Sequence, residues 1–195
     1  MVPLPLKTVY LTRGCDFMEE VILVDLQDNP IGVGEKLQVH LEGQLHRALS
    51  VFLFNSKGEM LLQQRAFEKY HSGGLWTNAC CSHPRPGEVV LDAAKRRLQE
   101  EMGIATELVR AFEFVYQAKL DHGLTEYEFD HVFYGIFNGS PKLNPEEACD
   151  WRWANLTDLK GEIEKSPERF TYWFKKIIAD SFQDLLNKSN VSVFG

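Results

Sequence analysis

The sequence predicts a single α/β or α+β domain, and three observations support that fold class. Segments dense in β-branched and aromatic residues lie before and after one amphipathic helix, and a second amphipathic helix closes the chain. The 195 residues fit one domain, and 44% apolar with 12% aromatic content is enough to build a core. No internal repeat, low-complexity block or linker divides residues 1–195, so we expect all elements to share one core.

The first half of the chain is mainly β in character. Residues 19–32 predict a strand followed by an Asp-Asn-Pro turn, and residues 46–65 predict a hairpin whose turn is Asn55 to Gly58. Residues 1–19 precede these strands, carry prolines and charges, and are expected to form an N-terminal extension.

Two helices alternate with further strands in the second half. A helix from Glu88 to Met102 is predicted because apolar residues recur at helical spacing and Gly103 stands where a C-cap glycine belongs. Residues 112–120 and 124–137 return to β character, and residues 171–188 predict a closing amphipathic helix. Residues 188–195 are expected to be a loose tail.

Composition limits the partners and the compartment. The net charge of −7 opposes general binding to nucleic acid or to anionic membranes, so an anionic ligand needs a local basic pocket. No run approaches the roughly 18 apolar residues of a membrane span. The cysteines at 15, 80, 81 and 149 are too few and too irregular for a disulfide framework, which predicts a soluble protein in a reducing cytoplasm.

Two glutamates end the central helix, where the helix dipole favours cations instead. Arg96 and Arg97 each stand four residues before one of them, Glu100 or Glu101, and simple neutralisation at the surface is one explanation. The other explanation is a bound divalent cation, because hard cations prefer carboxylate oxygens. The helix alone leaves both open.

A second acidic pair lies in the strand that follows. Alternation places Glu126 and Glu128 on one face, where they are either ordinary exposed residues or a pair sharing a metal ion or a proton. His40, His46 and His83 could supply nitrogen ligands for zinc, manganese or iron, although each alone could equally be structural. Three histidines and two glutamates would fill an octahedral site.

The adjacent cysteines raise a similar choice. Cys80 and Cys81 could both be small buried apolar residues, but His83 and a metal behind it would give Cys81 the electropositive surroundings of a reactive thiol. Other cations could form the basic pocket that the acidic total requires, or could be ordinary solvated residues. These are Lys36, Arg65, Lys69 and Arg97.

Several motifs together closely resemble a known family. The run WTNACCSHP, the segment GEVVLDAAKRRLQEEMGI, the EYE strand and the strand HRALSVFLFN are similar to the type I isopentenyl-diphosphate isomerases of the Nudix superfamily. The resemblance covers about residues 20–173 and implies a mixed β-sheet between helices. The Nudix signature residues are in register, except that Ser82 replaces a glycine and Arg97 replaces a glutamate. Losing that metal-binding carboxylate should weaken pyrophosphate hydrolysis and favour holding a diphosphate.

The resemblance also implies a ligand set and a reaction. His40, His46, His83, Glu126 and Glu128 would bind one metal, either Mn²⁺, Zn²⁺ or Mg²⁺. Glu101 and the carbonyl of Cys81 would bind a Mg²⁺ shared with the substrate diphosphate, which Lys36, Arg65, Lys69 and Arg97 would contact. Cys81 and Glu128 would transfer protons on opposite faces of an isoprenoid diphosphate, with Tyr116 beside the glutamate and Trp173 facing the carbocation.

Two other functions remain as alternatives at this point. A Nudix hydrolase of a nucleoside diphosphate derivative would release orthophosphate or a nucleoside monophosphate. A binding module with a structural metal site is the non-enzymatic alternative, although structural zinc usually has a closed, cysteine-rich tetrahedral shell. The expected assembly is a monomer or a homodimer.

Overall fold

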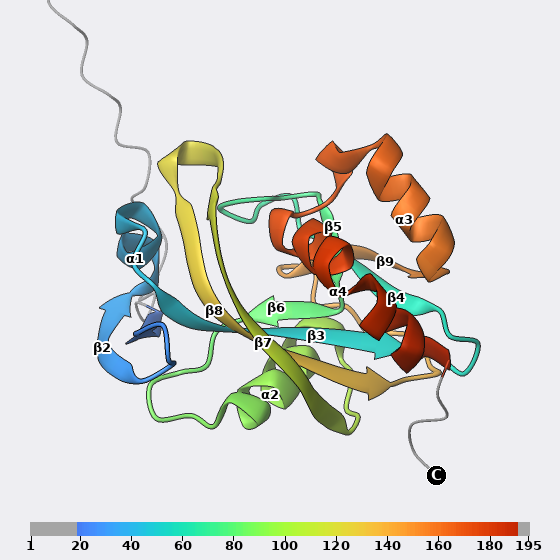
Figure 1. Ribbon diagram of the computed structural model, residues 1–195, viewed down its shortest axis with the longest axis horizontal. Coiled ribbons are helices and arrows are strands. Elements are labelled where there is room, and N and C mark those ends of the chain that lie inside the picture. The colour runs from blue at the N-terminus through green and yellow to red at the C-terminus, as the bar shows by residue number, and fades with distance from the viewer. Residues whose placement is uncertain (1–18, 191–195) are drawn as a thin grey trace, which may run out of the picture.

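The computed structural model describes residues 19–190, in which nine strands form one mixed sheet with helices on both faces (Figure 1). In chain order the elements are β1 (Glu20–Val24), β2 (Pro30–Glu35), α1 (Lys36–Glu42), β3 (His46–Phe54), β4 (Met60–Arg65), β5 (Trp76–Asn78), β6 (Cys80–Ser82), α2 (Val90–Met102), β7 (Leu108–Lys119), η1 (Asp121–Gly123), β8 (Thr125–Ile136), β9 (Ala148–Ala154), α3 (Leu156–Lys165), η2 (Pro167–Arg169) and α4 (Tyr172–Asn190). The sheet class therefore agrees with the fold predicted from the sequence.

Strand β3 organises the sheet. It pairs in parallel with β8 from His46 opposite Glu128 to Phe54 opposite Ile136, and in antiparallel fashion with the short strand β6. Strand β7 continues the sheet on the far side of β8. This pairing places segments that are distant in sequence beside one another at the start of β3, where the candidate site lies.

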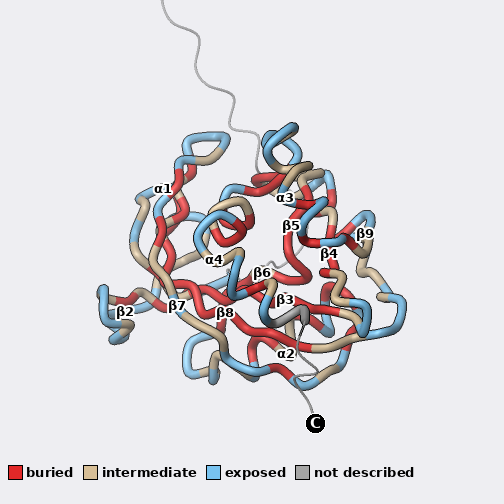
Figure 2. Tube along the Cα trace, turned by 45° about the vertical axis from the view of Figure 1, so that its right-hand side comes forward, coloured by how far each residue is buried: buried red, intermediate tan, exposed pale blue. Residues whose placement is uncertain are grey.

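Alternation along β3 divides the core into two layers. Phe52 and Phe54 belong to the cluster that packs under α3 and α4, whereas Val51 and Leu53 belong to the cluster that packs over α2. The tube coloured by burial shows buried segments in the central strands and more exposed segments around them (Figure 2). Both faces of the sheet are therefore covered, as a mixed sheet of this class requires.

The predicted hairpin is only partly confirmed. Its turn is present, with Gly58 at φ 74°, but β3 and β4 share a single paired position, Phe54 with Met60. Beyond the turn β3 pairs with β8 while β4 pairs with β9 and β5. Long-range pairing with buried partners has replaced the local hairpin ladder.

The predicted helices are present with shifted ends. Helix α2 begins at Val90 instead of Glu88, and it ends at Gly103, which has φ 64° and donates its N–H to the carbonyl of Gln99. Helix α4 extends to Asn190, past residue 188 where the tail was predicted to begin, and residues 1–18 and 191–195 of the predicted termini lie outside the described residues. Across residues 19–190, none of the helices combines the length and the apolar character needed to cross a membrane.

Candidate active site

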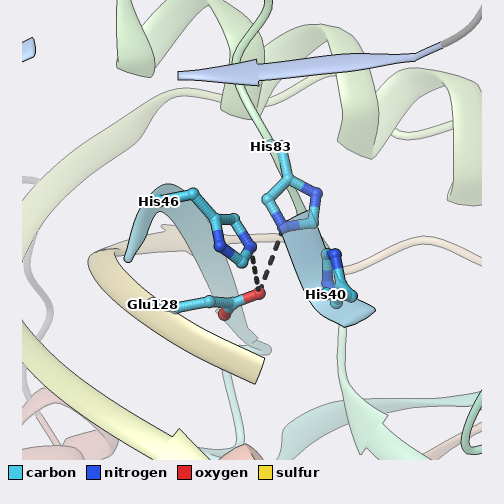
Figure 3. A group of neighbouring side chains, drawn as sticks. All are labelled: His40, His46, His83 and Glu128. Carbon is cyan, nitrogen blue, oxygen red and sulfur yellow. Dashed lines mark hydrogen bonds and ion pairs between the residues drawn. The ribbon is translucent and has the colours of Figure 1, made fainter. Parts of the chain in front are cut away.

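Three histidines and a glutamate converge at the start of β3 (Figure 3). His40 comes from α1, His46 is the first residue of β3, His83 follows β6 and Glu128 lies on β8. The parallel register sets His46 directly opposite Glu128. One potential ligand atom from each of the four lies within 4.8 Å of the others, and all four residues are buried.

Main-chain carbonyls fix two of these imidazole rings. Nδ1–H of His40 donates to the carbonyl of Lys36 at 2.7 Å, and Nδ1–H of His46 donates to that of Gln44 at 2.8 Å. A carbonyl can only accept, so the hydrogen lies on Nδ1 and the neutral ring has its lone pair on Nε2. Within residues 19–190 neither of these buried Nε2 atoms has a hydrogen-bond partner. Outer hydrogen bonds of this kind orient histidine ligands in metal sites. The residues present therefore fit a divalent cation.

Burial favours the neutral form of His40 and His83. It lowers the pKa of His40 to about 4 and that of His83 to about 3. Nε2 of His83 lies 3.1 Å from Oε1 of Glu128, and Nε2 of His46 lies 3.6 Å from the same oxygen. Imidazole nitrogens facing one carboxylate provide the donor set that transition-metal ions prefer.

Glu126 stands beside this group instead of within it. It shares a face of β8 with Glu128, as the strand alternation predicted, and phenolic oxygen atom Oη of Tyr116 lies 3.0 Å from Glu126 and 2.7 Å from Glu128. The potential ligand atoms of Glu126 cluster with His40 and His71. Four of the five ligands expected from the resemblance are thus gathered in one group, with the fifth adjacent to it.

The two carboxyl groups are electrostatically distinct. Burial, together with the charge of Glu128, raises the pKa of Glu126 well above its usual value. Burial alone would also raise the pKa of Glu128, but the contacts from His46 and His83 hold it well below the usual value. A proton shared by the pair therefore resides on the side of Glu126, and the histidine partners keep Glu128 ionised.

The alternation of strand β6 turns its two adjacent cysteines to opposite sides of the sheet. Cys80 is fully buried in the layer over α2, which confirms its interpretation as a small core residue. Cys81 points toward the opposite side, where its Sγ donates to Oδ1 of Asn78 at 3.1 Å and lies 3.2 Å from Oγ of Ser50. Ser50 in turn donates to Oδ2 of Asp130 at 2.7 Å.

The surroundings of Cys81 differ from the electropositive pocket expected from sequence. Burial, followed by the nearby charge of Asp130, raises the pKa of the Cys81 thiol well above its usual value. His83 does not offset this because burial keeps its imidazole neutral. Without a metal ion, Cys81 is therefore a protonated thiol suited to donating a proton, and not a preformed thiolate.

One small cavity of about 50 Å³ collects the remaining predicted residues. Its lining includes Cys81, His83, Glu101, Tyr116, Glu126, Glu128 and Trp173, together with the cations Lys36, Arg65, Lys69 and Arg97. Most cations there already have a partner. Lys36 pairs with Glu19 at 2.9 Å, Lys69 pairs with Glu147, and Arg97 lies 2.9 Å from Glu101 and 3.0 Å from Glu147. The predicted pairs of Arg96 with Glu100 and of Arg97 with Glu101 both form.

Trp173 lies between the core and the cavity. It is 2% exposed, is the second residue of helix α4 within the aromatic core layer, and also lines the cavity. The guanidinium of Arg65 lies 5.4 Å from its ring. The indole face therefore already has one cation over it at the edge of the cavity, as a cation–π pair requires.

Sequence reasoning missed four residues of this region. His71 and Glu147 line the cavity, and Ser50 with Asp130 lies behind Cys81. Ser50 and Asp130 lie in predicted strands, but the alternation within each strand does not say which strands pair. Their position on the same face as Cys81 depends on that pairing. His71 and Glu147 lie in loops, where no periodicity indicates direction.

Comparison with known proteins decides the family. The model of the NUDIX domain family matches residues 44–174. The chain is 55% identical over 155 residues to Isopentenyl-diphosphate Delta-isomerase 2 of Aromatoleum aromaticum, covering 80% of this chain and 82% of that protein. The chain belongs to the Nudix-type isopentenyl-diphosphate Delta-isomerase family.

Other members and structures agree with this placement. The Isopentenyl-diphosphate Delta-isomerase of Serratia proteamaculans is 54% identical, over 83% of this chain and 90% of that one. Among solved structures, a Deinococcus radiodurans protein matches with a TM-score of 0.67 at 17% identity, covering 89% of this chain and 100% of that chain. A Burkholderia pseudomallei MutT Nudix hydrolase matches with a TM-score of 0.55 at 20% identity, covering 74% and 97%. These two structures support the fold of the isomerase family member and nothing further.

Proposed function

We propose that the protein interconverts isopentenyl diphosphate and dimethylallyl diphosphate by protonation and deprotonation of the five-carbon unit. Relatives that carry this name match at 54 to 55% identity over most of the chain. The observation that carries the proposal is one cavity lined by a protonated thiol, Cys81, a carboxylate, Glu128, and a group of cations. An acid and a base facing one substrate pocket are the minimum that a double-bond shift requires.

The cations are proposed to hold the diphosphate. Lys36, Arg65, Lys69 and Arg97 reach the cavity from α1, the end of β4, the following loop and α2. An incoming diphosphate would compete with Glu147 for Lys69 and Arg97, which pair with it now. Mg²⁺ bound with the diphosphate at Glu101 and the carbonyl of Cys81 would offset the excess negative charge.

Proton transfer is assigned to the two ends of the cavity. Cys81 and Glu128 exchange protons with different carbons of the allylic unit, and Tyr116 orients or relays the proton at the Glu128 end. The indole of Trp173 faces the positive charge that develops at the tertiary carbon without forming a bond to it. The reaction adds one proton to the substrate and removes one proton from another carbon. It therefore needs an acid and a base but no nucleophile.

The histidine and glutamate group is proposed to bind one Mn²⁺, Zn²⁺ or Mg²⁺ through His40, His46, His83, Glu126 and Glu128. When bound, the ion supplies fixed positive charge that holds the carboxylates and tunes the basicity of Glu128. The remaining proposals are that the protein acts in the cytoplasm, on a small isoprenoid diphosphate, as a monomer or a homodimer.

The hydrolase alternative fits the pocket less well. Arg97 occupies the position on α2 where the Nudix signature of the hydrolases has a glutamate. Its guanidinium points into the cavity toward Glu101 and Glu147. A cation at this position removes one oxygen ligand for the metals that surround a bond being hydrolysed. It adds instead a partner for an intact diphosphate.

A deuterium-exchange experiment tests the proposal. The purified protein is incubated with isopentenyl diphosphate, Mg²⁺ and Mn²⁺ in deuterated water, and NMR follows double-bond position and deuterium content. We expect deuterated dimethylallyl diphosphate to form. Release of phosphate from nucleoside diphosphate derivatives, with no exchange into isopentenyl diphosphate, would move the assignment to the hydrolase branch.

The two cysteines supply a matched pair of variants. Cys81→Ala is expected to lower turnover by at least about 10³-fold, because it removes the proton donor from the cavity. Cys80→Ala removes one buried sulfur from the other layer and is expected to keep most of the activity while lowering stability by about 1 kcal/mol. Equal loss of activity in both variants would remove the distinction between the thiols.

A further inference from the structure

His71 lies in the loop between β4 and β5, and the proposed ligand set does not include it. Its side chain is 6% exposed and lines the same cavity as Glu126 and Trp173. The loop is tightly built: Arg65 donates through Nη2 to the carbonyl of His71 at 3.2 Å, and a Cβ on Gly73 would lie 2.5 Å from the carbonyl oxygen of Phe67. The backbone thus directs this histidine inward.

Glu126 is the acidic neighbour of His71. Nε2 of His71 lies 3.7 Å from Oε1 of Glu126, whereas Tyr116 approaches the other oxygen, Oε2, at 3.0 Å. On its other nitrogen, Nδ1, His71 has the hydroxyl of Ser72 at 3.4 Å. If Ser72 donates to Nδ1, Nε2 carries the hydrogen and faces the carboxylate.

His71 also lies beside His40 of the proposed metal group and beside Trp173. Its ring stacks on that of His40 with centroids 6.0 Å apart and meets the edge of Trp173 at 6.1 Å. Potential ligand atoms of His40, His71 and Glu126 lie within 4.8 Å of one another. Nδ1 of His40 is bonded to a carbonyl, which leaves Nε2 as its ligand atom. Because Nε2 can bind one ion at a time, the group with His46, His83 and Glu128 and the group with His71 and Glu126 cannot both use His40.

We propose that His71 is a positioning residue of the metal centre, which holds Glu126 through the electrostatic contact of its Nε2–H with Oε1, 3.7 Å away. The proposal rests on the proposed ligand role of Glu126 and adds the partner that orients it. His40 belongs to two groups of potential ligands. One group adds His46, His83 and Glu128, and the other adds only His71 and Glu126, so we assign the ion to the larger group. His71 then acts on Glu126 from one side while Tyr116 acts from the other.

Metal affinity tests this role without the isomerase reaction. Full-length protein is stripped of metal and titrated with Mn²⁺, and free Mn²⁺ is measured by electron paramagnetic resonance. We expect His71→Ala to weaken Mn²⁺ binding by about 10- to 100-fold, the range for loss of an outer partner of a metal ligand. His71→Gln should recover part of this affinity, because its amide N–H can donate to the same oxygen.

Two comparisons locate the effect. His122→Ala changes an exposed histidine on η1 that belongs to neither group of potential metal ligands, and should bind Mn²⁺ like the unchanged protein. In a Glu126→Gln background the further change His71→Ala should have little effect, since the partner carboxylate is already lost. Circular dichroism of each variant verifies that it is folded before titration.

Several outcomes would overturn the proposal. These are Mn²⁺ affinity within twofold of the unchanged protein in His71→Ala, no recovery in His71→Gln, and a full additional loss in the Glu126→Gln background. Failure of the isomerase proposal has a separate signature, namely no deuterium exchange with Mn²⁺ bound normally. The two ideas are therefore decided by different measurements.

Discussion

Residues Cys80 and Cys81 show how one residue step changes chemistry. On β6, Cys81 pairs with Ser50 and Cys80 with Val51, so their side chains point to opposite sides of the sheet. One sulfur is enclosed among apolar side chains, and the other reaches the cavity beside Asn78. Identical side chains therefore have a packing role and a proposed catalytic role.

Glu101 provides a prediction at this scale. It is 3% exposed, accepts from Gln63 at 2.9 Å and from Arg97 at 2.9 Å, and burial raises the pKa of its carboxyl group. We expect Glu101→Gln to raise the Mg²⁺ concentration for half-maximal activity by about 10-fold or more, because a neutral amide is a weaker ligand for a hard cation.

The measurement is activity against Mg²⁺ concentration at fixed isopentenyl diphosphate, with thermal unfolding as its companion. Glu100→Gln is the matched control, since Glu100 is the adjacent and more exposed glutamate of α2 and pairs with Arg96 and Arg97 on the surface. A collapse of the melting temperature in Glu101→Gln, with unchanged Mg²⁺ dependence in the folded fraction, would make Glu101 structural.

The candidate residues were predictable where short motifs and strand alternation defined them. The shared face of Glu126 and Glu128 followed from the period of a strand alone. His71 and Glu147 were not predictable, because each reaches the cavity from a loop whose direction is set by tertiary contacts. The raised pKa of the Cys81 thiol was also not predictable, since Asp130 lies 49 positions away in the sequence.

Among the elements, the end of α2 links a helix to the cavity. The last carbonyls of the helix accept N–H groups from the loop between β8 and β9, Lys142 to Met102 at 2.8 Å and Asn144 to Glu101 at 2.9 Å. That loop continues to Glu147, which pairs with Arg97 of the same helix. Capping of α2 and placement of Glu147 are therefore one structural arrangement.

Gly103 makes this arrangement possible and supplies a prediction. A Cβ at this position would lie 2.6 Å from the carbonyl oxygen of Lys142, and the residue has φ 64°. We expect Gly103→Ala to destabilise the protein by about 1–3 kcal/mol, from left-handed strain and from displacement of the loop. Urea denaturation measures the change.

Gly161 of α3 is the control for that substitution. It lies inside a helix, and a Cβ there would meet no atom within 4 Å. Gly161→Ala is expected to be neutral or to stabilise by up to about 1 kcal/mol, because alanine has the higher helix propensity. Similar midpoints for the two variants would show that the loop between β8 and β9 adapts freely.

Elements whose signals are local were predicted, and those that depend on distant partners were not. Helix α2 and strands β7 and β8 carry strong periodicity, whereas α1 spans seven residues and begins with a glutamate cap that sequence rules rank low. Strand β9 is stabilised by pairing with β4 across the sheet. The divergence of β3 and β4 beyond their turn has the same origin.

For the whole molecule, the acidic total and the cationic cavity are compatible because the cations are paired locally. The net charge is −7, yet Lys36, Lys69 and Arg97 each face a glutamate at the cavity. A diphosphate is therefore attracted at short range, after exchange of partners, and not by a long-range field.

Metal binding should stabilise the whole fold. His40, His46, His83 and Glu128 come from a helix, two strands and a loop, so a bound ion would connect segments 88 residues apart in sequence. At an ion concentration 100-fold above the dissociation constant, the gain is about 2.7 kcal/mol. We expect the melting temperature of metal-stripped protein to rise by roughly 5–10 °C on adding Mn²⁺ or Zn²⁺, and chelation to reverse it.

Differential scanning calorimetry across a series of ion concentrations measures this shift. His46→Asn, which removes one ligand at the start of β3, should show a much smaller rise. A rise of the same size in that variant would mean that the ion binds elsewhere.

The parallel pairing of β3 with β8 has a consequence for how the chain folds. His46 faces Glu128 only in the native alignment, and a slip of one position would bring Phe129 or Tyr127 to the histidines and turn the carboxylate to the other side of the sheet. Parallel strands so far apart in sequence are slow to align, because the long intervening loop must close first. An ion that binds only the correct alignment would selectively stabilise chains that have completed this step, so the timing of metal uptake during refolding would report when the centre of the sheet is in place.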